Sequence, residues 1–379
     1  MKTTRYKDYD WWLIISALLL TMFGIIMIYS ASFPLAIDIY DNASHFFDRQ
    51  LIWFVVGMGL LVFFMHFRYD MWRKLSPLLI LGSVLLLITV LLVGTHIRGA
   101  TSWITIGPFT IQPSEFVKLA VIIYLAQVYS QKQAYINKFI SGVLPPLVVV
   151  VFIFSLIMLQ PDLGTAAAIL MTAGIIVFLS GAKWRHLTVL ALLSGGVITY
   201  FAISESYRMQ RLIAFRDPFE TAERASGGAY QLIQSYISFA HGGLTGTGLG
   251  QSVQKMHYLP DPHTDFILAV IAEELGIFGI GFVLLCLLMI AWRGVLAGIR
   301  CRQTFGTLLA FGIVFQLVSQ AIVNAGAASG LLPITGLPFP FLSYGGSSLL
   351  VSLASIGIVA NISREGNRIK REQDENQAA

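Results

Sequence analysis

Charged residues are scarce in this chain. Only 12% of its 379 residues are Asp, Glu, Lys or Arg, whereas 56% are hydrophobic. Soluble domains carry about 25% charged residues, and water could not solvate so much apolar surface. The composition therefore excludes a soluble fold and predicts that lipid surrounds most of the chain.

Cysteine is almost absent, and the sequence shows no cleavable signal pattern. Cys286 and Cys301 are the two cysteines, which excludes a disulfide framework and indicates no metal site. Residues 1–10 are short and polar, and the apolar run that follows is too long for the core of a signal peptide. We expect that run to remain as the first transmembrane helix.

Long apolar runs are what the sequence has in abundance. Runs long enough to cross a bilayer lie at 11–30, 51–67, 77–94, 114–129, 142–159, 164–180, 187–203, 265–292, 307–327 and 345–361. They predict an all-α polytopic membrane protein of about ten transmembrane helices, with both termini on one side. We expect one transmembrane domain over residues 1–363 and a polar tail over 364–379 that is disordered.

The placement of Lys and Arg predicts the orientation. They concentrate at both termini and in the loops near 68–74, 132–138, 183–185 and 293–302. The short loops of the opposite set carry only Arg49 and Arg98, and the long 204–264 loop is discounted because long loops cross regardless of charge. The termini are therefore predicted to be cytoplasmic and the 204–264 loop extracytoplasmic. Basic residues spread over so many loops do not indicate nucleic-acid binding.

The outer loops hold four polar patches, and the first covers residues 98–118. Pro113 fits the first turn of a helix, which places Glu115 and Lys118 on one helix face. Charges inside a span are usually functional or paired, so these two residues either serve a site or hold the helix end as an ion pair. Trp103 is either a site residue or an interfacial aromatic.

The second patch is the tight turn at 160–165, and the third is the long 204–264 loop. Asp162 either caps the next helix or acts in a site. Arg208 and Arg211 share a face if their segment is helical, and Arg216 follows them. Arginine clusters suit phosphate groups, although an interfacial helix on anionic lipid is the alternative. The glycine run at 242–250 lacks the P-loop lysine and is weak evidence for phosphate binding.

Asp265 follows His263 at the end of the long loop and opens a strongly apolar span. A partly desolvated carboxylate there can act as a general base; the alternative is a helix-start residue favoured by the dipole. Glu273, two turns deeper, is expected to pair with a basic group such as Lys118. The fourth patch, 332–348, has no charge and is rich in Pro and Gly, which predicts a re-entrant or rigid outer loop that shapes a site.

Together the patches resemble the SEDS family (shape, elongation, division and sporulation), which includes FtsW, RodA and SpoVE. The matching strings occur in the family's order and span nearly the whole chain: GATSWITIGPFTIQPSEFVK, LQPDLGTA, GTGLGQSVQKMHYLPDPHTDFILAVIAEELG and LLPITGLPFPFLSYGGSS. One departure is Ser102, where family members often have an arginine, and Arg98 is a candidate substitute. The start of the chain looks more like FtsW, whereas residues 336–340 lean toward RodA, and we favour the division type.

The resemblance implies a peptidoglycan glycosyltransferase that polymerises lipid II at the outer face of the bacterial cytoplasmic membrane. It assigns Asp265, in the string His263–Thr264–Asp265–Phe266, as the catalytic carboxylate. A divalent cation (Mg²⁺ or Mn²⁺) is a further candidate, and the partners expected are the growing glycan strand, a class B penicillin-binding transpeptidase and other division or elongation proteins. The candidate substrate-binding residues are Trp103, Glu115, Lys118, Arg208, Arg211, Arg216, His263 and Ser343.

Two other functions are compatible with the sequence. A lipid II flippase or transporter would need groups accessible from both faces, whereas the polar patches here are nearly all predicted to lie outside. If the protein were a non-enzymatic scaffold of a cell-wall complex, Asp265 would have no chemical role.

Overall fold

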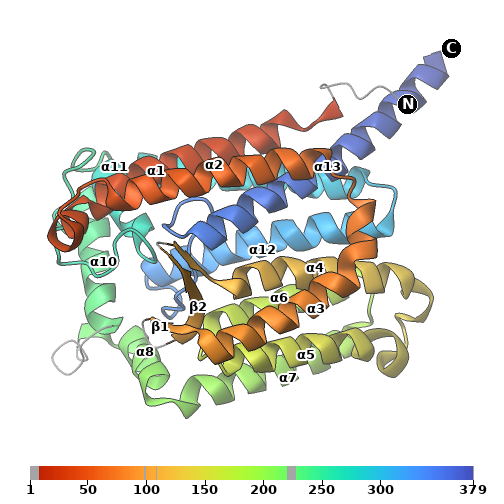
Figure 1. Ribbon diagram of the computed structural model, residues 1–379, viewed down its shortest axis with the longest axis horizontal. Helices are drawn as coiled ribbons and strands as arrows, with labels where there is room; N and C mark the ends of the chain where they lie inside the picture. Colours follow the sequence, from red (N-terminus) through yellow and green to blue (C-terminus); the bar gives the residue numbers. More distant parts are fainter. Residues whose placement is uncertain (1–7, 98–99, 108, 220–227, 379) are drawn as a thin grey trace.

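The computed structural model describes residues 8–97, 100–107, 109–219 and 228–378, and its long helices run side by side in one bundle (Figure 1). Each of the predicted spans coincides with a helix. These helices are α1 (Trp11–Tyr40), α2 (His45–His66), α3 (Asp70–Val93), α4 (Pro113–Gln131), α5 (Leu144–Met158), α6 (Leu163–Leu179), α7 (Trp184–Ser204), α11 (Ile267–Arg300), α12 (Thr304–Ala328) and α13 (Gly346–Ala378). Within the described residues, eight helical segments are long and apolar enough to cross a membrane, and α6 is a shorter apolar helix. The predicted all-α membrane fold is confirmed.

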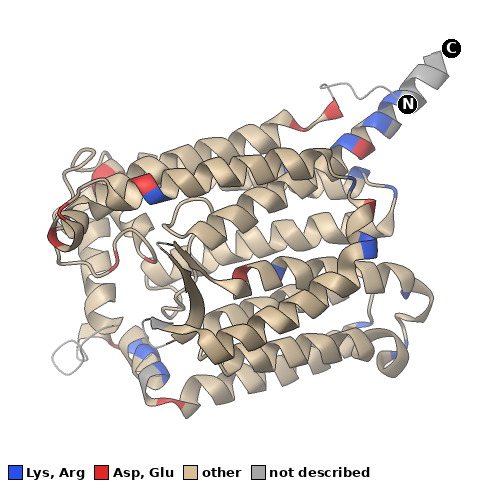
Figure 2. Ribbon diagram, viewed as in Figure 1, with Lys and Arg blue, Asp and Glu red and all other residues tan. Residues whose placement is uncertain are grey.

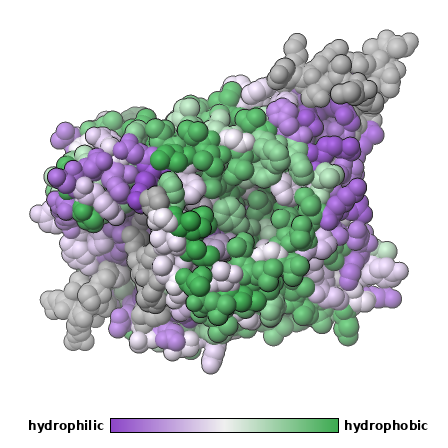
Figure 3. Space-filling model, viewed as in Figure 1, coloured by the Kyte–Doolittle hydropathy of each residue, from purple (hydrophilic) through white to green (hydrophobic). Residues whose placement is uncertain are grey.

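The two ends of the chain lie at the same end of the bundle. Asp8 pairs with Arg371 at 2.6 Å, and Asp10 pairs with Arg293 at 2.7 Å. Most of the described Lys and Arg residues lie toward this end (Figure 2), as expected if it faces the cytoplasm. An apolar belt separates it from the other polar end (Figure 3), which is the surface pattern that a bilayer requires.

Helix α13 lies at the centre of the bundle. The most apolar stretch of this helix, within Gly346–Arg368, is completely buried. Small residues along the helix let the neighbouring helices approach closely. At Gly357, for example, an added Cβ would lie 2.7 Å from the carbonyl oxygen of Leu61 on α2. The predicted disordered tail was wrong, since α13 continues as a helix through Ala378. Contacts such as Asn367 Nδ2 to the Asp8 carbonyl, at 3.1 Å, fasten this extension.

A small antiparallel sheet connects α3 to α4, and the sequence analysis did not predict it. Its strands are β1 (Thr95–Ile97), β2 (Ala100–Ile106) and β3 (Phe109–Ile111), in that order. Ile106 pairs with Phe109 across a two-residue turn, where Gly107 adopts a φ of +58°. Alternating β-branched residues around a Gly-containing two-residue turn are a hairpin signal that was available in the sequence.

The described part of the long outer loop includes helices α8 (Ser206–Arg216) and α10 (Gly228–Gly242), followed by the glycine run. That run packs on α11 where the helix kinks at Gly276, whose φ is +60°. Thr247 and Gly248 donate backbone hydrogen bonds of 2.9 Å to the carbonyls of Glu273 and Glu274. The glycines therefore serve a close backbone contact, and none of residues 242–250 lines the cavity described below.

Candidate active site

A cavity of about 840 Å³ opens among the outer loops. Its wall is formed by the ends of α1 and α7, the starts of α2 and α6, strand β2, helix α8 and the segments that precede α11 and α13. The predicted fourth patch contributes residues 332–338 and 344–348 to this wall. The expectation that this irregular segment shapes a cavity is therefore confirmed.

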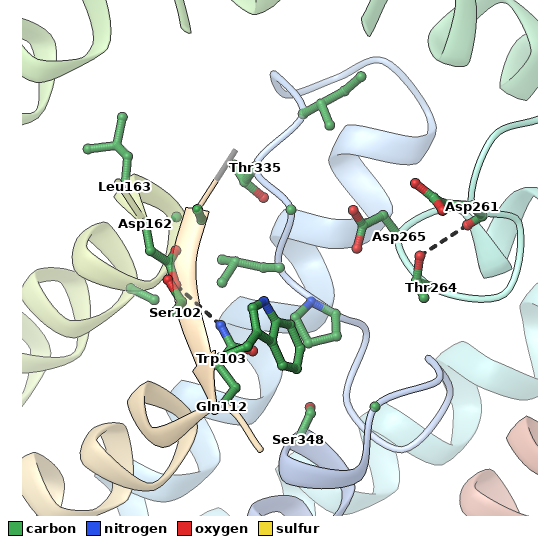
Figure 4. Close-up of a pocket in the computed structure, with 18 of the residues that line it drawn as sticks. Ser102, Trp103, Gln112, Asp162, Leu163, Asp261, Thr264, Asp265, Thr335 and Ser348 are labelled. Carbon is green, nitrogen blue, oxygen red and sulfur yellow. Dashed lines mark hydrogen bonds between the residues drawn. The ribbon is translucent and has the colours of Figure 1, made fainter. Parts of the chain in front are cut away.

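Carboxylates lie on opposite sides of the cavity (Figure 4). Asp261 and Asp265 project from the segment that precedes α11, and Asp162 projects from the start of α6. Asp261 has a φ of +54°. Its carbonyl accepts two hydrogen bonds from Thr264, one from the backbone nitrogen at 3.1 Å and one from the side-chain hydroxyl at 3.2 Å. This tight turn brings both carboxylates of the segment to one side of the cavity.

Three of the arginines that the structure describes line the same cavity. Arg208 and Arg211, which the sequence predicts to share a helical face, both contribute to the wall from α8. The guanidinium of Arg208 is held by a 3.0 Å hydrogen bond to the carbonyl of Phe201. Arg49 of α2 is a third wall residue that was not predicted, while Arg216 is exposed and absent from the wall. Guanidinium groups arranged in this way suit an anionic phosphate group.

Glu115 and Lys118 lie behind the cavity wall, not in it. Their side chains are 3% exposed each and form an ion pair of 2.8 Å, so the predicted shared helix face is confirmed. The expected pairing of Lys118 with Glu273 is wrong. Lys118 instead donates to Gln320 of α12 at 2.7 Å, and Glu273 accepts hydrogen bonds from Ser252 and from the backbone of Val253. The loop that packs on α11 therefore supplies hydrogen-bond donors to Glu273.

Strand β2 and the turn before α6 form a common part of the wall. Trp103 lines the cavity, as Figure 4 shows, and the neighbouring Ser102 donates to the carbonyl of Gln160 at 3.3 Å. Asp162 accepts from the backbone nitrogen of Thr165 at 3.0 Å, which confirms the predicted helix cap, and it also lines the cavity. Arg98, the candidate substitute for the family arginine, lies outside the described residues.

His263 and Ser343 occupy different positions. His263 lines the cavity, and its ring packs on Phe46 and Tyr344 at centroid distances of 4.5 and 5.6 Å. Ser343 is buried behind the wall and donates to the carbonyl of Thr264 at 2.6 Å. Burial raises the pKa of Tyr344 in the wall, and Arg49 opposes that shift. The Tyr344 hydroxyl is therefore neutral near pH 7.

The described carboxylates of the cavity do not form a metal site made of protein side chains alone. Among the residues that the structure describes, no group of three or more His, Cys, Asp or Glu side chains is placed to hold a metal ion. Mg²⁺ is usually held by one or two carboxylates together with substrate phosphates. Asp261 and Asp265 lie on one side of the cavity, and Asp162 lies across from them.

Comparisons with known proteins agree with the fold and the motifs. A family profile described as "Cell cycle protein", which covers FtsW, RodA and SpoVE, matches residues 10–368. The probable peptidoglycan glycosyltransferase FtsW of Bacillus subtilis is 44% identical over 94% of this chain and 91% of its own length. Stage V sporulation protein E of the same organism is 40% identical over 96% of this chain and 99% of its own length.

A solved structure has the same architecture. It comes from a study of the structural coordination of polymerization and crosslinking by a peptidoglycan synthase complex. The TM-score is 0.76 at 27% identity, over 94% of this chain and 98% of the other. With its apolar helices and its near full-length family match, the chain is a multi-pass membrane protein that belongs to the FtsW/RodA/SpoVE family.

Proposed function

We propose that this protein is a peptidoglycan glycosyltransferase that polymerises lipid II at the outer face of the cytoplasmic membrane. One observation carries the proposal: a single cavity combines the carboxylate of Asp265 with the guanidinium groups of Arg208 and Arg211 and an apolar wall from α6 and α7. Lipid II joins a sugar, a pyrophosphate and a prenyl chain, and each part has a chemically matched surface there. The names of the relatives support the same activity.

In the proposed reaction, Asp265 takes the proton from the acceptor sugar 4-hydroxyl as that oxygen attacks the anomeric carbon of the donor. The new glycosidic bond forms while the bond from the anomeric carbon to the pyrophosphate breaks. Negative charge then grows on the leaving pyrophosphate, and preorganised cations stabilise it without reorganisation. Arg208 and Arg211 line the cavity from α8 and are suited to this task.

The other wall residues bind and orient the substrate in this proposal. Trp103 offers an aromatic face to a sugar ring, and His263 shapes the wall beside Asp265. Glu115 and Lys118 support the wall from behind through Gln320. The site lies away from the end that holds Asp8 and Arg371, and the positive-inside rule supports an outward-facing position for it.

The partner proposed is a class B penicillin-binding transpeptidase, which crosslinks the strands that the polymerase makes. The solved complex with similar architecture couples polymerization with crosslinking in its description, which supports such a partner. Between the biological roles, the identity of 44% to FtsW against 40% to the sporulation protein favours division.

Reconstitution of the purified protein with lipid II tests the activity. We expect glycan strands resolvable on gels, with the partner transpeptidase added if the polymerase alone is slow. Movement of labelled lipid II between leaflets without polymer would contradict the proposal and favour a flippase. No polymer and no movement from well-folded protein with its partner would favour a scaffold.

A further inference from the structure

The segment that carries Asp265 is held by three successive hydrogen bonds to its backbone. The backbone nitrogen of Tyr344 donates to the His263 carbonyl at 2.9 Å. The hydroxyl of Ser343 donates to the Thr264 carbonyl at 2.6 Å, and the side-chain amide of Asn324 donates to the Asp265 carbonyl at 3.0 Å. All three donors belong to α12 or to its connection with α13, so one part of the chain fixes this segment residue by residue.

Asn324 makes the most specific of these contacts. It is 2% exposed, and its amide nitrogen also donates to the Leu337 carbonyl at 2.8 Å. An amide nitrogen carries two hydrogens, and here each serves a different loop. The opposite orientation of the amide would press its oxygen against two carbonyl oxygens. One side chain thus joins the backbone of Asp265 to the 332–348 segment, in which Leu337 lines the cavity.

The preceding turn of α12 extends this connection to α4. Gln320 is 5% exposed, accepts from Lys118 at 2.7 Å and donates to the Pro338 carbonyl at 2.8 Å. Pro338 adjoins Leu337, the residue that Asn324 binds. The buried ion pair on α4 and the Asp265 segment are therefore both tied to the same short stretch of backbone. Buried polar contacts of this kind are directional and hold one arrangement.

We propose that Asn324 is a positioning residue for Asp265, which it holds in place by clamping the Asp265 backbone to the cavity loop. The proposal rests on the proposed function in assigning the proton transfer to Asp265. A reacting group displaced by about 1 Å can lose about a hundredfold in rate. Losing the clamp should therefore slow the chemical step and leave substrate binding by the arginines intact.

Asn324→Asp is the most specific variant, because it keeps the shape of the side chain and replaces the amide nitrogen, which donates two hydrogen bonds, with an oxygen. Asn361→Asp is its matched control. Asn361 is also a buried asparagine, 1% exposed, and it joins the Met65 carbonyl at 2.7 Å and the Tyr69 nitrogen at 3.0 Å near the opposite end of the bundle. Both substitutions should cost stability, but only Asn324→Asp should affect Asp265.

Two readouts test the proposal. In steady-state polymerisation normalised to folded protein, Asn324→Asp should lower kcat about tenfold or more and leave KM within about twofold, while Asn361→Asp leaves both unchanged. For the second readout, Cys286 and Cys301 are replaced by Ala and Asp265→Cys introduces a single thiol at the site. The rate at which a small methanethiosulfonate labels this thiol is then measured. Asn324→Asp should change the labelling rate at least about threefold. A substitution at a site that does not contact Asp265 should change this rate by less than that.

Thiol labelling needs no polymerisation, so it separates failure of this inference from failure of the proposed function. A folded Asn324→Asp protein with the labelling rate of the parent overturns the positioning role, as does a rise in KM without a fall in kcat. If Asn324→Asp does not fold, Asn324→Ser, which is smaller and keeps a single hydroxyl donor for the two carbonyls, gives the same two readouts. Parental kcat and labelling in that variant would equally overturn the proposal.

Discussion

Removal of the Lys255 ammonium should destabilise the protein strongly. Lys255 and Glu274 form an ion pair of 2.6 Å with side chains that are 1% and 0% exposed. At that distance the attraction is about 6 kcal/mol for an effective dielectric constant of about 20, and desolvation of both charges offsets part of it. In Lys255→Met, Glu274 stays buried with the Ser30 hydroxyl at 2.7 Å as its closest hydrogen-bond partner. We expect a loss of about 3–5 kcal/mol in the free energy of unfolding.

A double-mutant cycle in mixed micelles measures this effect. Lys255→Met, Glu274→Gln and the double variant are unfolded by titration with denaturing detergent. Because the double variant leaves no buried unpaired charge, it should recover part of the loss, with a coupling energy of about 1–3 kcal/mol. A Lys255→Met protein as stable as the parent, or losses that simply add, would refute the reasoning that this pair fastens the outer loop to α11.

Two further pairs of variants test packing and substrate binding. Gly24→Ala on α1 would put a Cβ 2.5 Å from the Phe341 carbonyl oxygen and should lower the free energy of unfolding by about 1–3 kcal/mol. Gly59→Ala, whose Cβ would meet nothing within 4 Å, should be neutral or stabilising by up to about 1 kcal/mol. Equal melting temperatures of the two variants would contradict the close packing of α1 on Phe341. Arg211→Ala, in the cavity wall, should raise KM for lipid II about tenfold or more, because a charge-assisted hydrogen bond contributes about 1.5–3 kcal/mol. Arg216→Ala, outside the wall, should leave KM near its original value; an equal rise in both would argue against this cavity as the binding site.

The helices could be predicted from the sequence because each long apolar run leaves a strong local signal. The helix that holds Asp10 at its N-cap, for example, begins at Trp11, where the apolar run starts. The sheet was missed because its residues were considered as a polar patch, although the string from Ile104 to Ile111 carried a hairpin pattern. The polarity of the tail predicts disorder, but the tail is helical. Its polarity does not reveal the ion pair between Arg371 and Asp8, which forms only in the folded chain.

The cavity was predictable in part. Motifs on successive loops identified Trp103, Arg208, Arg211, His263 and Asp265, all of which line it. The supports behind the wall were not found, since Gln320 and Asn324 are isolated amides in an apolar helix and belong to no recognisable motif. Their partners are backbone carbonyls such as Pro338 and Leu337, which only the folded chain brings within reach.

The most direct test of the catalytic assignment is the polymerisation rate of Asp265→Asn in the reconstituted system. A general base contributes about 10²–10⁴-fold, so the folded variant should lose at least about a hundredfold in kcat. The control is Asp38→Asn, another outer carboxylate, which pairs with His257 at 2.8 Å and does not line the cavity; it should retain the parental rate. Glycan strands formed at the parental rate by folded Asp265→Asn would contradict the account.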